Sequence, residues 1–130
     1  LEWELINGRL LQLEKRKRVA SLIPLFKALG YTPIVITARP EVKGDVFRAH
    51  VSRVYGIKMS DIYMTQEKAE ILNKRKTVIF FGDSDSDITE AKKADVKAIR
   101  VKRSGEDQKR GNYNPGEFGE WILPFSEGHD

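Results

Sequence analysis

The chain has 130 residues, 40% of them hydrophobic and 32% charged, and carries a net charge of +4. A chain of this length builds one hydrophobic core, so we expect a single domain over residues 1–130. No run approaches the roughly 20 apolar residues of a membrane span. The absence of cysteine excludes disulfides and thiolate chemistry.

Helical and strand patterns alternate along the chain. A helical period over residues 19–29 ends at Gly30 and contains Pro24, which predicts a kinked helix or two short ones. Further helices are expected over residues 46–54, 67–73 and 87–94. Strands are expected over residues 33–37, 61–64, 77–81, 98–101 and 121–123. Strands separated by helices predict an α/β fold, with a parallel sheet covered by helices on both faces.

Polar residues follow two of the predicted strands. The first strand runs into Thr37, Ala38 and Arg39, and the strongest strand runs into the segment 82–87, Gly-Asp-Ser-Asp-Ser-Asp. Ligands bind beyond the carboxyl ends of parallel strands. A hydroxyl and a guanidinium suit phosphate oxygens, and carboxylates suit Mg²⁺. Taken singly, each feature has a plainer interpretation: a strand-end hydroxyl, a surface charge, and an acidic cap on the next helix.

The order and spacing of these segments resemble the haloacid dehalogenase superfamily. Its motif II is an apolar strand ending in Thr or Ser, matched by Val35-Ile36-Thr37. Its motif III is a lysine, matched by Lys68, and its motif IV is an apolar strand ending in an acidic pair, matched by the segment 82–87. The resemblance implies a Rossmann-type parallel sheet.

Several segments resemble the class B acid phosphatases more narrowly. Arg39 follows Thr37 at the spacing of that family, and residues 81–89 look like its motif IV segment. The Gly-x-Phe-Gly-Glu segment of the family tail is matched by residues 116–120, and a Trp-Glu pair by residues 3–4. The resemblance therefore covers nearly the whole chain.

The resemblance implies metal-dependent hydrolysis of phosphomonoesters, among which nucleotides are candidates. Thr37, together with the backbone amides near Ala38, would hold phosphate oxygens, and Arg39 would recognise substrate phosphate. Lys68 would offset the charge that phosphate shares with the nucleophile.

The acidic residues receive separate roles from the same resemblance. Asp83 would hold Mg²⁺, and Asp87 would orient Lys68 or a metal-bound water. Asp85 receives no definite role. The family further implies periplasmic export or secretion, with a cytoplasmic location as the alternative, and assembly into homo-oligomers.

The nucleophile of such an enzyme has no match in the chain. The superfamily attacks phosphorus with the first aspartate of an Asp-x-Asp motif I, but no aspartate precedes Thr37. We expect an upstream segment to supply it, so that this chain alone is inactive or associates with that segment. The motif I strand would lie between strands 33–37 and 77–81, leaving a slot about 9 to 10 Å wide, twice the spacing of paired strands.

Two alternatives stay open. A degenerate, non-catalytic domain could retain motifs II to IV and bind phosphate or metal. The basic run at residues 15–18, Lys-Arg-Lys-Arg, could bind nucleic acid, but no aromatic residues interleave with it, so neither nucleic acid nor a membrane is an expected partner.

Overall fold

The computed structural model describes residues 17–38 and 44–127. Arg39, the Trp-Glu pair at residues 3–4 and the first half of the basic run lie outside the described residues. The chain divides into two compact units, residues 1–66 with 129–130 and residues 67–128. The single domain stays a prediction.

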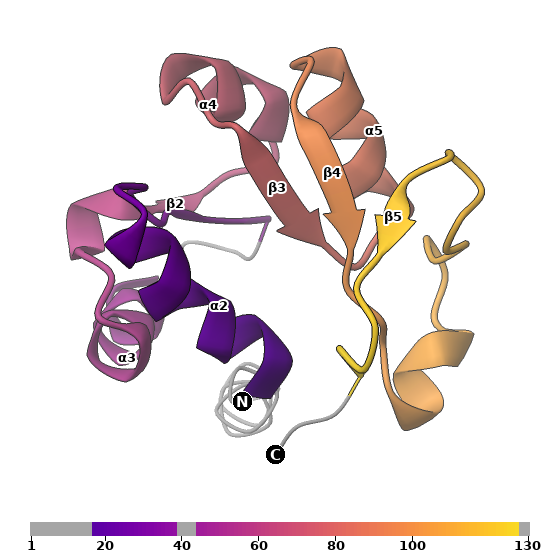
Figure 1. Cartoon of the computed structure of the whole chain (residues 1–130), viewed down its shortest axis with the longest axis horizontal. Coiled ribbons are helices and arrows are strands. Elements are labelled where there is room, and N and C mark those ends of the chain that lie inside the picture. Colours follow the sequence, from indigo (N-terminus) through magenta and orange to yellow (C-terminus); the bar gives the residue numbers. More distant parts are fainter. Residues whose placement is uncertain (1–16, 39–43, 128–130) are drawn as a thin grey trace. The chain divides into compact units, whose positions relative to one another are not determined.

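The first unit contains two helices and two short strands (Figure 1). Helix α2, Lys17–Ala28, runs through Pro24 as one helix, and Gly30 follows it with φ of +94°. Strand β1, Val35–Thr37, is shorter than predicted. Helix α3, Gly44–Tyr55, a 3₁₀ turn, Met59–Asp61, and strand β2, Ile62–Met64, complete the unit. The predicted helices and strands are confirmed here to within a few residues.

Strand β1 pairs with β2, and its first residue, Val35, packs against the core of this unit. The two strands pair in parallel, with Val35 opposite Ile62 and Thr37 opposite Met64. Beyond the pair, the amide of Thr65 donates to the carbonyl of Thr37 at 2.7 Å. The core of this unit consists of buried apolar side chains from α3, β2 and the loop between them: Phe47, Val51, Ile57, Ile62 and Met64. These contacts fix the end of β1 at which Thr37 lies.

The second unit is a parallel three-stranded sheet with two helices (Figure 1). Its first elements are helix α4, Lys68–Lys74, strand β3, Ile79–Gly82, and helix α5, Asp85–Lys93. They are followed by strand β4, Lys97–Arg100, a 3₁₀ helix, Gly105–Lys109, and strand β5, Trp121–Ile122. The sheet order is β3-β4-β5, and both pairings are parallel. The predicted α/β fold with parallel strands is therefore confirmed; the 3₁₀ helix was not predicted.

The core of the second unit lies where α4 and α5 pack together. Leu72 of α4, with Ile88 and Ala91 of α5, is completely buried. Helix α5 also packs on β3 and β4. The loop from β3 into α5 therefore connects two elements that are packed against each other. Within the described residues β1 and β3 belong to different sheets and do not pair with each other. The slot for a motif I strand between them stays a prediction.

Candidate functional site

The β3–α5 loop carries the predicted motif IV residues and is shaped by a capping box. Ser84 precedes α5, and its Oγ accepts a hydrogen bond from the amide of Asp87 at 3.1 Å. In return, Oδ2 of Asp87 accepts from the amide of Ser84 at 3.3 Å. This reciprocal arrangement satisfies two amides at the start of the helix. It also fixes the side chain of Asp87 against the end of β3.

Lys68 and Asp87 form an ion pair from two different helices. Nζ of Lys68, the first residue of α4, contacts Oδ1 of Asp87, and the two side chains are only 14% and 8% exposed. The start of α4 is held as well, since the amide of Ala69 donates to Oε1 of Glu90 on α5 at 3.3 Å. The charge of Lys68 is therefore held at the carboxyl end of β3.

Gly82 is required for this arrangement because Asp87 lies directly against it. A Cβ at residue 82 would stand 2.4 Å from Cβ and 2.7 Å from Cγ of Asp87. Gly82 is the last residue of β3 and is not among the glycines with positive φ. It therefore serves close approach, not the tight turn that a glycine after a strand suggests.

Asp83, the predicted magnesium ligand, pairs with an arginine. Its side chain is 43% exposed, and its Oδ2 accepts from Nε of Arg103 at 2.7 Å. Nη1 of Arg103 also donates to the carbonyls of Arg110 and Gly111 at 3.3 and 3.1 Å. The exposed carboxylate of Asp83 is thus accessible to a ligand but shares its charge with a guanidinium.

The exposed carboxylate of Asp83 is of the chemical kind that binds magnesium, but it is a single ligand. Mg²⁺ is commonly bound through one or two carboxylates, with water and substrate phosphate as further ligands. Within residues 17–38 and 44–127, no group of three or more His, Asp or Glu side chains is placed to hold a metal ion. Further protein ligands would have to come from other residues.

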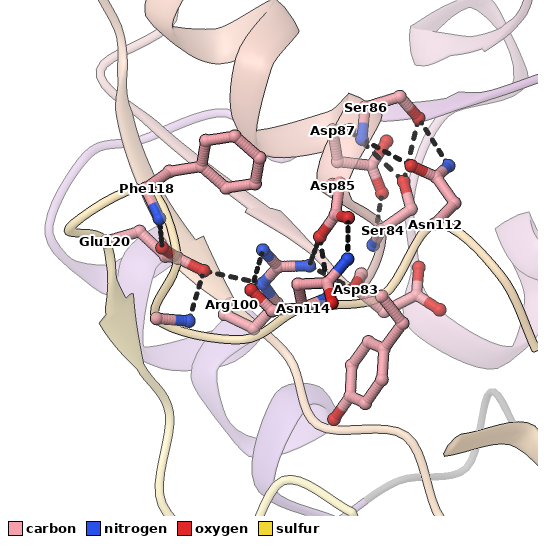
Figure 2. Close-up of polar contacts among 12 residues, drawn as sticks. Asp83, Ser84, Asp85, Ser86, Asp87, Arg100, Asn112, Asn114, Phe118 and Glu120 are labelled. Atoms are coloured by element: carbon pink, nitrogen blue, oxygen red, sulfur yellow. Dashed lines mark hydrogen bonds and ion pairs between the residues drawn. The ribbon is translucent and has the colours of Figure 1, made fainter. Parts of the chain in front are cut away.

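Asp85 and Glu120 flank a fully buried arginine (Figure 2). Nε of Arg100 donates to Oε2 of Glu120 at 2.7 Å, and Nη1 donates to Oδ1 of Asp85 at 2.9 Å. The same nitrogen donates to the carbonyl of Asp83 at 2.9 Å. The backbone and side-chain amides of Asn114 donate to Asp85 at 2.7 and 2.6 Å. Asp85, which had no definite predicted role, therefore ties the loop at residues 112–120 to the β3–α5 loop.

The carboxylate of Glu120 stabilises the loop formed by the Gly-x-Phe-Gly-Glu segment. Its Oε2 accepts from the amide of Gly116 at 2.9 Å, and its Oε1 accepts from the amide of Phe118 at 3.1 Å. The carboxylate thus folds its own loop and compensates Arg100 at once. The sequence did not predict the ion pair between Arg100 and Glu120. Two features could have indicated it: a charged residue inside an apolar strand pattern, and a glutamate in the tail segment.

The two carboxyls titrate at lower pH than usual. Burial alone raises the pKa of Asp85, but hydrogen bonds from Asn114 and the charge of Arg100 outweigh it and leave the pKa lowered. Burial likewise raises the pKa of Glu120, and the donors at Gly116, Arg100 and Phe118 together lower it further than burial raises it. Both groups therefore stay ionised under mildly acidic conditions.

The N-terminus of α5 is closed by Asn112. The carbonyl of Asn112 accepts from the amide of Asp85 at 2.8 Å, and its Oδ1 accepts from the amide of Ser86 at 3.1 Å. Together with the capping box, these bonds use the amides that a helix start would offer to an anion. This helix start is therefore not a phosphate site.

The structure places the predicted site residues in both units. In the second unit, Lys68 and Asp87 form an ion pair, and Asp83 directly follows β3 and pairs with Arg103. Thr37 ends β1 in the first unit, and Ala38 follows it with an exposed side chain. Arg39 lies outside the described residues. The catalytic and binding roles of these residues stay predictions.

Curated class B acid phosphatases match nearly the whole chain. The one from Rahnella sp. (strain Y9602) is 28% identical over 135 residues, covering 96% of this chain. Those from Salmonella typhimurium and Proteus mirabilis are 27% and 26% identical over the same share of the chain. The chain is a distant relative of the class B acid phosphatases.

The chain spans 57% of the length of these class B acid phosphatases. No family model matches it. Among the helices that the structure describes, none is long and apolar enough to cross a membrane.

Proposed function

We propose that this chain forms the motif II to motif IV part of a metal-dependent acid phosphatase that hydrolyses phosphomonoesters. The observation that supports it best is the buried Lys68–Asp87 ion pair, in the same β3–α5 region of the chain as the exposed carboxylate of Asp83. The similarity to class B acid phosphatases over 96% of the chain supports phosphoester hydrolysis as the reaction class.

Lys68 supplies a fixed positive charge to the reaction. Its ammonium offsets the charge of the substrate phosphate as an attacking carboxylate approaches, which lowers the repulsion between the two anions. Asp87 is a positioning residue, because its carboxylate holds Nζ of Lys68 and is itself held by the capping box with Ser84. Most of this catalysis is positioning and charge stabilisation.

Asp83 contributes one ligand to Mg²⁺. Its carboxylate is the exposed one at the end of β3, as a cation site in contact with solvent and substrate requires. When bound, the metal neutralises phosphate charge and polarises the phosphorus–oxygen bonds.

Thr37 and Ala38 bind the phosphate oxygens through a hydroxyl and a backbone amide, and Arg39 binds the same phosphate. The nucleophile is an aspartate from polypeptide outside these 130 residues, since no aspartate precedes Thr37. Its carboxylate oxygen bonds to phosphorus as the ester oxygen leaves, taking a proton from a second acid. Water then hydrolyses the aspartyl phosphate. Periplasmic export and homo-oligomer formation stay predictions of the resemblance.

The test is hydrolysis of p-nitrophenyl phosphate in the presence of Mg²⁺. The 130-residue chain is assayed alone and after joining to a segment that carries an Asp-x-Asp motif. We expect activity only with the segment, and its loss when the first aspartate of that motif is changed to asparagine. In the active form, Lys68→Met should lower kcat by on the order of 100-fold or more.

Matched control variants distinguish the loss of the site from the loss of the fold. Lys74→Met removes an exposed lysine at the other end of α4, and Asp95→Asn removes an exposed carboxylate after α5. Both should keep full activity. Activity that survives Lys68→Met and Asp83→Asn unchanged would contradict the proposal. A joined chain that binds phosphate without turnover would favour the non-catalytic alternative.

A further inference from the structure

The pairing of Asp83 with Arg103 bears on how tightly the site holds a cation. The side chain of Asp83 is 43% exposed and can be reached from solvent, whereas that of Arg103 is only 10% exposed. One carboxylate is thus shared between a buried guanidinium, at Oδ2, and whatever binds at its open side.

Arg103 is anchored by contacts other than Asp83. Its Nη1 donates to the carbonyls of Arg110 and Gly111, and its Nη2 donates to that of Asn112 at 3.5 Å. Its guanidinium carbon lies 4.7 Å from the centre of the Tyr113 ring. Its backbone amide also donates to the Tyr113 hydroxyl at 3.1 Å. A cation arriving at Asp83 therefore meets a guanidinium that the loop at residues 110–113 holds in place.

The neighbouring arginine differs from Arg103 in charge balance. Arg100 is fully buried between the carboxylates of Asp85 and Glu120, so its charge is more than compensated. Among the described residues, the carboxylate paired with Arg103 is that of Asp83, the same group that would hold the metal. A cation bound by Asp83 would therefore be repelled by the positive charge of Arg103, which pairs with the same carboxylate.

We infer that Arg103 sets the cation affinity of Asp83, holding it below what the carboxylate would have alone; this rests on the proposed metal role of Asp83. The guanidinium of Arg103 and a divalent ion bound to the same carboxylate repel each other. At the dielectric constant of water, this repulsion corresponds to about a tenfold change in the affinity for the ion. Cation binding in turn weakens the Asp83–Arg103 bond by the same factor.

The test is a Mn²⁺ titration of the 130-residue chain at low ionic strength, followed by water-proton relaxation, which registers weak binding. Arg103→Met and Arg103→Gln should each lower the Kd for Mn²⁺ about tenfold. Arg103→Lys, which keeps the charge, should stay near the wild-type Kd. Lys109→Met, which removes an exposed charge from the same segment, should leave the Kd unchanged.

Asp83→Asn separates the two ideas. If it leaves Mn²⁺ binding intact, the proposed metal role of Asp83 is wrong, and this inference fails with it. If it abolishes binding but the neutral Arg103 variants bind no more tightly than wild type, only this inference is overturned. A gain in Arg103→Lys as large as in Arg103→Met would show that charge is not the cause. Binding in no variant would contradict both ideas.

A second measurement needs no change at Arg103, should its variants fail to fold. Saturating Mg²⁺ should speed amide exchange at residues 110–113 in the wild type, because the loop loses part of its hold on Asp83. The same addition should have no effect in Asp83→Asn. Unchanged exchange in the wild type would overturn the inference.

Discussion

Replacing Arg100 with methionine tests whether the buried arginine holds the second unit together. Arg100 has no exposed side-chain surface, and its partners Glu120 and Asp85 are 1% and 16% exposed. Removing one member of a buried ion pair costs about 3–5 kcal/mol, since the remaining charge stays buried without compensation.

The structure places the expected loss near the lower end of that range. Glu120 keeps its amide donors at Gly116 and Phe118, and Asp85 keeps both donors of Asn114. Those bonds partly stabilise the carboxylates after the guanidinium is gone. We therefore expect Arg100→Met to lower the free energy of unfolding by about 3 kcal/mol, a large part of the 5–15 kcal/mol typical of domains.

Urea unfolding followed by tryptophan fluorescence measures this loss. In a Trp3→Phe background the signal comes from Trp121, which lies on β5 next to Ile99 of β4. Lys109→Met is the control and should change the free energy of unfolding by less than about 0.5 kcal/mol, because its ion pair with Glu106 is exposed.

A loss below about 1 kcal/mol for Arg100→Met would refute the reasoning, since that is the size of a single ordinary hydrogen bond. A double-mutant cycle with Glu120→Gln sharpens the test. The two losses should add to more than the loss in the double variant, because the same pair is broken in each.

Three further perturbations have definite outcomes. Gly82→Ala should destabilise the chain by about 1–3 kcal/mol, because the new Cβ displaces Asp87, and the melting temperature should fall accordingly. Ser84→Ala removes the cap of α5 and should cost about 1 kcal/mol in urea unfolding. The lowered pKa values of Asp85 and Glu120 stabilise the fold above their usual values of 3.8 and 4.5, and this stability is lost as pH falls through the depressed values. Below about pH 4.5, the free energy of unfolding should therefore fall less steeply with decreasing pH for the double variant Asp85→Asn, Glu120→Gln than for wild type. Equal slopes would contradict the pKa shifts.

The order of helices and strands could be read from the sequence because periodicity and glycine positions are local signals. Gly30, at which the sequence predicts a helix end, has positive φ after α2, and Gly56 has positive φ directly after α3. Strand β3 was evident as an apolar run, and its polar continuation marked the site. The 3₁₀ helix after Ser104 was missed, because its five residues, Gly105–Lys109, carry no apolar period.

The buried polar network depended on contacts that sequence spacing does not reveal. Arg100 meets Asp85 across 15 residues and Glu120 across 20, so its compensation becomes visible only in the fold. Arg103 likewise reaches Asp83 from 20 residues away. The motif residues Lys68 and Asp87 were identified by resemblance, but the reason for Gly82 between them required the position of the Asp87 side chain.

The central proposal is that Asp83 holds a divalent cation close to Lys68 at the carboxyl end of β3. Mn²⁺ added to the ¹⁵N-labelled chain tests it directly, since the ion broadens amide signals near its binding site. We expect the amides of Ser84 and Lys68 to broaden, and both to stay sharp in Asp83→Asn. Broadening elsewhere that leaves these two amides sharp, or broadening that is unchanged in Asp83→Asn, would contradict the proposal.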